Sequence, residues 1–229
     1  MTTIFIFLAA AIGFFLGYKK KNKATNVSKP NLENKVKDRF PKETQKKSQE
    51  HLVVECLKAQ IDSEKEILLN NLTLPLKDGT TTQIDHVLIS KRGIFVIESK
   101  DYNAWIFGQE KDTHWTASYP NKKQYSFQNP LRQNYKHTQA IENILDFVPK
   151  EQVHSLIVFS GKTTFKTDMP DNVIYLKDLP DYLKKYQAEP ISLEQVHLGL
   201  GRLSFVRLPE TAETDEAHIK QLNLKHQNS

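Results

Sequence analysis

The chain has 229 residues, of which 38% are hydrophobic, and its formal net charge is +5 at pH 7. This length is enough for one domain of ordinary size with appendages. The single cysteine, Cys56, excludes an intramolecular disulfide framework and a zinc site built on several cysteines.

The positive charge is concentrated in one stretch. Residues 19–47 contain eleven Lys and Arg against three acids, whereas residues 48–229 contain 21 Lys and Arg against 24 acids. The basic character therefore belongs to a linker. The remainder does not have the broad basic surface of many nucleic-acid-binding domains.

An apolar segment precedes this linker. Residues 2–18 (TTIFIFLAAAIGFFLGY) are uncharged, and four lysines follow within the next five residues. The length is at the short end of the range that crosses a bilayer core, and the lysines predict that the following chain stays in the cytoplasm. We therefore predict a transmembrane anchor over residues 1–18 and a single-pass membrane protein with a cytoplasmic domain. A cleaved signal peptide and a buried helix of the domain are the alternatives.

The stretch over residues 19–47 is polar and Lys-rich, which predicts a flexible linker. Its lysines would lie beside the membrane, where they can bind anionic lipid headgroups. A solvated spacer that is kept extended by its own charge is the alternative.

A mixed α/β domain is expected over residues 48–207, and a polar, poorly ordered tail over residues 208–229. Apolar periodicity, the Asn-Pro pair at residues 129–130 and the capping-box spacing of Ser192 and Gln195 indicate the helices. The expected helices lie over residues 48–61, 129–147, 179–186 and 192–203. The expected strands lie over residues 67–75, 83–100 (a hairpin), 104–109, 153–160 and 172–176.

The hairpin, QIDHVLISKRGIFVIESK, contains acids inside an otherwise apolar sequence. If its turn has an even number of residues, Ser90 pairs with Gly93. Asp85 then lies directly opposite Glu98, and cross-strand partners share a face of the sheet. An odd turn with Gly93 in a bulge would shift this pairing.

Two carboxylates that lie opposite each other repel unless a positive charge lies between them. A divalent cation supplies that charge, and strand alternation puts Lys100 on the face of Glu98. We therefore predict that Asp85 and Glu98 bind a divalent metal ion. The alternative is a structural cluster in which the acids form ion pairs with Lys100 or Arg92.

Two helices are expected to add polar side chains to this site. Glu50 falls on the apolar side of the first helix, where it either reaches the acidic site or interacts with the helix dipole. Gln133 and His137 are four residues apart and therefore lie on one side of the next helix. For His137 alone, a half-buried packing histidine is the simpler interpretation.

The hairpin, Trp115 and the stretch NPLRQNYKH from Asn129 together resemble the nuclease-related domain (NERD) family. This family is grouped with the PD-(D/E)xK, restriction-endonuclease-like enzymes. The resemblance extends over roughly residues 48–159. It implies a restriction-endonuclease-like mixed sheet that is flanked by helices and has a metal site at its edge.

The resemblance also implies roles for single residues. Asp85 and Glu98 would hold one or two Mg²⁺ (or Mn²⁺) ions, and Lys100 would orient the attacking water or neutralise charge on the phosphate. Glu50 matches the family's helix Glu and Gln133 its helix Gln. Relatives commonly have Gly-Glu where this sequence has Gln-Glu.

The expected activity is metal-assisted hydrolysis of phosphodiesters in DNA or RNA. Hard oxygen ligands suit Mg²⁺, which polarises a phosphoryl oxygen and lowers the pKa of a bound water. One alternative is a binding or scaffold module that retains the nuclease fold without turnover, which the negative balance of residues 48–229 favours. A structural membrane protein is the other.

Overall fold

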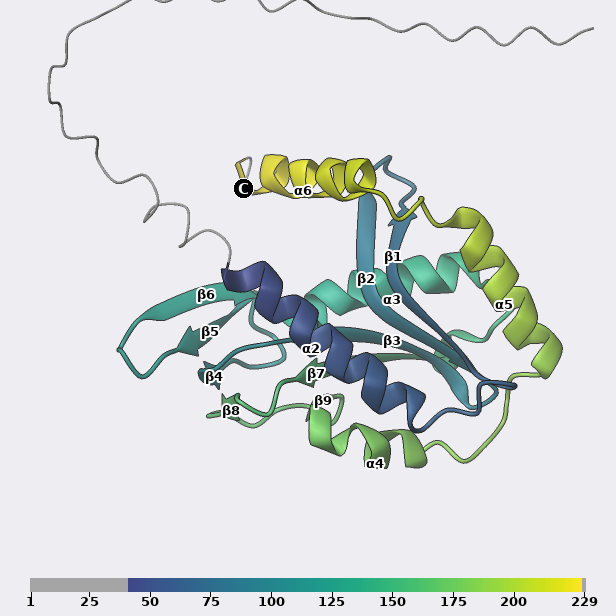
Figure 1. Cartoon of the computed structure of the whole chain (residues 1–229), viewed down its shortest axis with the longest axis horizontal. Helices are drawn as coiled ribbons and strands as arrows, with labels where there is room; N and C mark the ends of the chain where they lie inside the picture. Colours follow the sequence, from purple (N-terminus) through teal and green to yellow (C-terminus); the bar gives the residue numbers. More distant parts are fainter. Residues whose placement is uncertain (1–40, 228–229) are drawn as a thin grey trace, which may run out of the picture. The chain divides into compact units, whose positions relative to one another are not determined.

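A central five-stranded sheet organises residues 41–227, the part of the chain that the computed structural model describes (Figure 1). The helices are α2 (Pro41–Lys58), α3 (Pro130–Ile144), α4 (Leu179–Lys184), α5 (Leu193–Val206) and α6 (Ala212–Gln227). The strands are β1 (Ile67–Pro75), β2 (Thr81–Ser90), β3 (Gly93–Lys100), β4 (Trp105–Phe107), β5 (His114–Ser118), β6 (Gln124–Gln128), β7 (Val153–Phe159), β8 (Thr164–Phe165) and β9 (Val173–Tyr175).

The predicted anchor over residues 1–18 lies outside the described residues, as do residues 19–40 of the predicted linker. Within residues 41–227, no helix is both long enough and apolar enough to cross a bilayer.

The central sheet has the strand order β1-β2-β3-β7-β9. The first three strands pair antiparallel, and β3, β7 and β9 pair parallel. The predicted mixed α/β architecture is therefore confirmed. Strand β3, which contains Glu98 and Lys100, lies in the middle, between β2 and β7.

Helices cover both faces of this sheet. On one face, α3 and α5 bury the side chains of Ile141, Val196 and Leu203 against alternate residues of β2 and β3. On the other face, Val53 and Leu57 of α2 pack, together with α4, against the residues of β2 and β3 that alternate with the first set. Because both faces are covered, nearly every residue of β3 is buried.

A smaller four-stranded sheet, ordered β6-β5-β4-β8, continues from the ends of β3 and β7. Backbone hydrogen bonds extend the contact between the two chain segments beyond the central sheet, from Ser160 N to Lys100 O (2.9 Å) and from Thr164 N to Ala104 O (3.0 Å). The core of the small sheet contains Trp115, which stacks on Phe159 of β7.

The predicted hairpin register is confirmed. Ser90 pairs with Gly93, and the β2–β3 ladder runs to the pair His86 and Ile97. One further step along this ladder would bring Asp85 opposite Glu98.

The side-chain alternation of β1 and β2 reverses at one point. In β2, both Ile84 and Val87 contribute to the core beneath α3 and α5, although strict alternation would put them on opposite faces. In β1, Asn71 interrupts the ladder with a φ of 50°. Asp85 is the residue that strict register would pair with Asn71, so it lies at the reversal.

Both predicted helix caps are confirmed. The side chain of Asn129 accepts a hydrogen bond from Leu131 N, and Pro130 opens α3. Ser192 and Gln195 form a reciprocal capping box at the start of α5.

Two segments differ from the sequence-based expectation. Helix α2 begins at Pro41, so the last part of the predicted linker is helical. The tail, which was expected to be poorly ordered, contains α6. Polar contacts attach α6 to β2, because His218 Nδ1 lies 2.8 Å from Thr81 Oγ1 and Gln221 accepts from Thr81 N at 2.7 Å. Because these contacts are polar, the spacing of apolar residues in the sequence does not reveal them.

Gly108 provides a test of how tightly the small sheet is packed. A Cβ at this position would overlap the ring of Trp115, whose Nε1 donates to Gln109 O at 2.9 Å. Gly108→Ala is therefore expected to lower the free energy of unfolding by about 1–3 kcal/mol, the usual cost of overpacking. Urea denaturation measures this loss. Gly161→Ala is the matched control, because open space surrounds that position, and an equal loss in both variants would contradict the assignment.

Candidate active site

The candidate site is centred on the carboxylate of Glu98, whose side chain is 1% exposed. Its Oε1 accepts hydrogen bonds from Lys100 Nζ and from Gln133 Nε2, the latter at 2.8 Å. Lys100 also donates to Gln133 Oε1 at 3.0 Å. The three predicted residues thus form a closed triangle between β3 and α3.

His137 lies beside the other oxygen of the same carboxylate. Its Nε2 lies 3.3 Å from Glu98 Oε2, and its Nδ1 lies 2.7 Å from Thr82 Oγ1. Gln133 and His137 both face Glu98 because they are one helical turn apart on α3. His137 is therefore part of the site and is also buried.

Asp85 lies next to this cluster at the reversal in β2, and it is 3% exposed. Its Oδ2 accepts from the backbone N–H and the hydroxyl of Ser99, both at 2.9 Å. The backbone nitrogen of Ser99 is bonded directly to Glu98, so Asp85 contacts β3 one residue beyond the Glu98 side chain. The interrupted alternation explains why Asp85 turns towards the backbone of β3.

Glu50 lies at a pocket that Asp85 also lines. It is half-buried, and the residue of α2 on the buried face with Val53 and Leu57 is Gln49, which is 2% exposed. Glu50 is thus less buried than Gln49, but it lies at the same pocket as Asp85, and its role in the site stays a prediction. The pocket has a volume of about 470 Å³ and is lined by Glu50, His51, Val54, Asn70, Asn71, Gln83, Asp85, His86, Glu210, Asp215 and Ile219.

The donor set fits a hard divalent cation. Mg²⁺ typically uses one or two carboxylates and keeps several waters, and Asp85 and Glu98 supply two buried carboxylates on neighbouring strands. Among residues 41–227 no group of three or more His, Cys, Asp or Glu side chains is arranged to hold a metal. Water or substrate oxygens would therefore complete the coordination. The shared ion remains a prediction.

Sequence reasoning missed two partners of the site. Ser99 stands between the predicted residues Glu98 and Lys100, and its hydroxyl and N–H hold Asp85. Thr82 lies near the start of β2, far along the chain from His137. The signal for Ser99 was present, because a serine in the buried run IFVIESK needs a hydrogen-bond partner.

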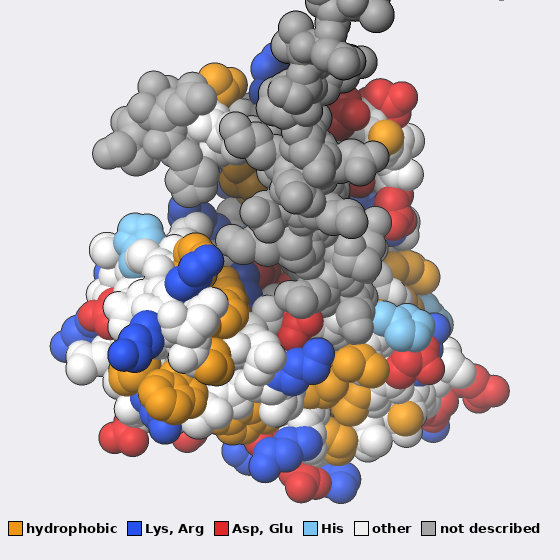
Figure 2. Space-filling view, turned by 60° about the vertical axis from the view of Figure 1, so that its left-hand side comes forward, with side chains coloured by type: hydrophobic (Ala, Val, Ile, Leu, Met, Phe, Trp, Pro, Cys, Tyr) orange, Lys and Arg blue, Asp and Glu red, His pale blue; other side chains and the backbone are white. Residues whose placement is uncertain are grey.

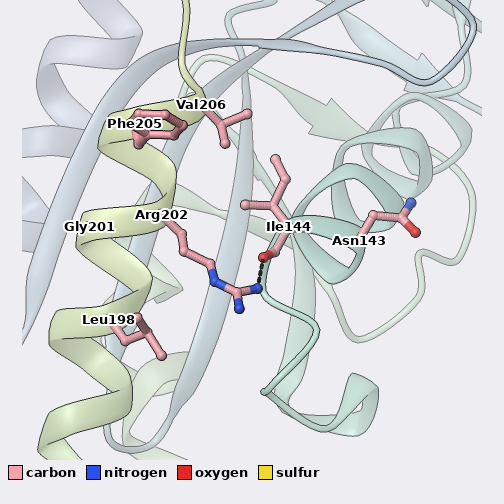
Figure 3. Close-up of a pocket in the computed structure, with 7 residues that line it drawn as sticks. All are labelled: Asn143, Ile144, Leu198, Gly201, Arg202, Phe205 and Val206. Atoms are coloured by element: carbon pink, nitrogen blue, oxygen red, sulfur yellow. Dashed lines mark hydrogen bonds between the residues drawn. The ribbon is translucent and has the colours of Figure 1, made fainter.

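A second hollow lies between α3 and α5 (Figure 3). Apolar side chains dominate its lining, and Arg202 donates to Ile144 O at 2.9 Å across it. None of the predicted site residues lines this hollow, so it is separate from the candidate active site.

Thr82→Val is expected to lower the free energy of unfolding by about 1–2 kcal/mol, because it leaves a buried imidazole nitrogen of His137 without its hydroxyl partner. Valine has nearly the same shape, so packing should be unchanged. Denaturation in urea measures the loss. Thr116→Val, at a half-buried position of β5, is the control, and equal losses would contradict the role of the Thr82–His137 contact.

Comparisons with known proteins identify the family to which the chain belongs. The sequence pattern of the nuclease-related domain family matches residues 45–160. An uncharacterized protein of Bacillus anthracis is 34% identical over 198 residues, which cover 85% of this chain and 91% of that protein. No solved structure matches the chain.

Proposed function

Because the chain belongs to the nuclease-related domain family, we propose that it is a metal-dependent nuclease that hydrolyses phosphodiester bonds in DNA or RNA. Asp85 and Glu98 are the proposed ligands of Mg²⁺ or Mn²⁺. Lys100 and Gln133 are the proposed substrate-side residues. The mixed sheet with helices on both faces supports a nuclease-like fold.

The observation that supports this proposal most strongly is the hydrogen-bonded triangle of Glu98, Lys100 and Gln133, with Asp85 on the neighbouring strand. Burying carboxylates and an ammonium costs free energy, because each charge loses its hydration. A core built only for stability would use apolar residues there. A site that binds a cation and a phosphate needs all of these charges.

Each residue has a distinct role in the proposed reaction. A divalent ion in this site polarises a phosphoryl oxygen and lowers the pKa of a bound water. Lys100 supplies positive charge to the phosphate, and its bond to Gln133 fixes the direction of its ammonium group. Gln133 holds one oxygen of Glu98 by a hydrogen bond, and His137 lies 3.3 Å from the other. Glu50 lines the same pocket as Asp85, and we propose that its negative charge contributes to metal binding.

The test is cleavage of single- and double-stranded DNA and RNA by the full-length protein in Mg²⁺ or Mn²⁺, with EDTA as the metal-free comparison. Cleavage that requires the metal and is lost in Lys100→Met supports the proposal. Lys185→Met is the control, because Lys185 is exposed at the C-terminal end of α4 and lies over the ring of Tyr182. Failure to cleave any of the four substrates would contradict the proposal.

A second candidate is a binding or scaffold module without turnover. The observation that favours it is that protein groups already engage both acids, Asp85 through Ser99 and Glu98 through Lys100. Titration calorimetry distinguishes the two candidates. A silent module binds nucleic acid equally well with and without metal and is unaffected by Asp85→Ala.

We also propose that the apolar segment over residues 1–18 anchors the protein in a membrane, with the following domain in the cytoplasm. The lysines of residues 19–47 would then lie next to anionic headgroups. Fractionation of cells that express the full chain tests this proposal. Recovery of the intact chain without membranes would contradict it.

A further inference from the structure

The outer face of the small sheet displays large aromatic side chains. Trp105 and Phe107 occupy alternate positions of β4 and are 53% and 39% exposed, whereas Ile106 between them is fully buried. Neighbouring strands place only polar side chains on this face, because Trp105 pairs with Ser118 and Phe107 with Thr116. The two rings therefore project side by side from an otherwise polar surface.

Four exposed lysines lie on the strands and turns of the small sheet, whereas Asp101, Glu110, Asp112 and Asp168 lie in the loops that adjoin it. The sheet segments over residues 102–107, 113–128 and 161–167 contain Lys122, Lys123, Lys162 and Lys166 and no Asp or Glu. All four lysines are exposed. In contrast, residues 48–229 as a whole have more acids than Lys and Arg. Figure 2, which brings this side of the molecule forward, shows hydrophobic side chains beside Lys and Arg.

Lys166 is a lysine that lies directly beside one of these aromatic rings. Its Nζ lies 4.6 Å from the centre of the Trp105 ring, and it follows the β8 residue that pairs with Ile106. The ammonium group therefore stands on the same face as both aromatic rings.

The aromatic face is also connected to the candidate active site. Strand β4 begins five residues after Lys100, and hydrogen bonds from Ser160 and Thr164 hold the intervening chain against the segment that leads from β7 into β8. A ligand on this face would therefore bind to strands that the hydrogen-bonded segment after Lys100 connects directly to the candidate active site.

We propose that this face binds single-stranded nucleic acid, with bases stacked on Trp105 and Phe107 and a phosphate held by Lys166. The assignment of nucleic acid as the ligand rests on the proposed function. Exposed aromatic side chains on a sheet stack on bases without reading their sequence, and nearby lysines bind the backbone. In a duplex the faces of the bases are already stacked, so a double strand cannot use these rings.

Fluorescence anisotropy of a labelled oligothymidylate about 12 nucleotides long, in the size range of such surfaces, measures this binding. The full-length protein in detergent is titrated in EDTA, so binding is recorded without cleavage. Trp105→Leu and Phe107→Ala are each expected to weaken binding by about 5- to 100-fold, which corresponds to the loss of one stacked base. Trp105→Phe, which keeps a ring, is expected to retain most of the affinity.

Matched controls separate stacking from other effects. Phe205→Ala removes a ring that is 91% exposed on α5 and is expected to leave binding unchanged. Lys166→Gln is expected to weaken binding and to lower the salt slope by about 0.7, the value for one phosphate contact with a single strand. Lys185→Gln, with a similar position over Tyr182, should have no effect.

Several outcomes would overturn the inference: equal binding of wild type and Trp105→Leu, equal affinity for a duplex of the same length, or no binding of the oligothymidylate. Binding to phosphatidylcholine–phosphatidylglycerol vesicles that depends on Trp105 would also overturn it, because the face would then contact a membrane. Metal-dependent cleavage is measured separately, so a failure of this inference and a failure of the proposed function give different results.

Discussion

Asp85→Asn is expected to lower metal-dependent cleavage by about a thousandfold while leaving the protein folded. The substitution removes one of two buried carboxylates that are proposed to hold the metal. The amide oxygen of asparagine can still accept a hydrogen bond from Ser99, as the carboxylate does. Asp85→Asn also removes a buried negative charge, so the free energy of unfolding should be unchanged or higher. Initial cleavage rates in Mn²⁺, together with urea denaturation, measure both quantities.

Asp146→Asn is the matched control for this variant. Asp146 is an aspartate that pairs with Arg202, and its side chain is 69% exposed. The Asp146→Asn variant should cleave at the wild-type rate. If Asp85→Asn retained full metal-dependent activity in a folded protein, Asp85 could not be a metal ligand, and the nuclease proposal would lose one of its two acids.

Asn129→Ala is expected to lower the free energy of unfolding by about 2–4 kcal/mol, because several hydrogen bonds are lost at once. The Asn129 side chain is fully buried and caps α3 by accepting from Leu131 N. Its Nδ2 also donates to the backbone oxygens of Glu110 and Asp112, at 3.0 and 2.8 Å. Alanine would leave these carbonyls buried without a donor. Chemical denaturation monitored by circular dichroism measures the loss.

The same variant should also disturb the candidate active site. Asn129 fixes the first turn of α3, and Gln133 lies one turn further along. Weaker cleavage together with reduced stability is therefore expected. Asn143→Ala removes an exposed asparagine from the other end of α3. It should change the free energy of unfolding by no more than about 0.5 kcal/mol and leave the cleavage rate unchanged. A similar loss in both variants would show that the cap has no special role.

The hairpin register could be predicted from the sequence because it depends on local chemistry. The turn between Ser90 and Gly93 leaves only two residues, and glycine adopts the φ of 145° found there. Once that turn is set, the position of every residue on β3 follows. The grouping of Glu98 with Lys100 followed from the two-residue period of a strand. The cap at Asn129 placed the start of α3, and the family resemblance assigned Gln133 to the site.

The exact direction of Asp85 could not be predicted, because it depends on a reversal that no sequence period describes. Asn71 adopts a left-handed conformation on the neighbouring strand, and the alternation of both strands changes there. Asparagine tolerates this conformation, but it does not require it. A period-two pattern therefore places residues correctly on one side of the reversal only.

The burial of Glu50 on α2 could not be predicted exactly for a related reason. Glu50 and Gln49 are adjacent, so a small rotation of the helix decides which of them is buried. The long-range packing of Val53 and Leu57 on the sheet sets that rotation. Helix α6 was missed because its contact with β2 is made by His218 and Gln221, which are polar residues.

The parallel pairing of β3 with β7 has a consequence for how the protein is made. The segment between Lys100 and Val153 contains the whole small sheet except β8, and also α3, and a ribosome must synthesise all of it before β3 gains its second neighbour. Pairing across so long a loop is slow, because chain entropy opposes it. A nascent chain that stops before Val153 would therefore display Glu98 on an open strand edge. The candidate active site therefore gains its second flanking strand only after β7 has been synthesised.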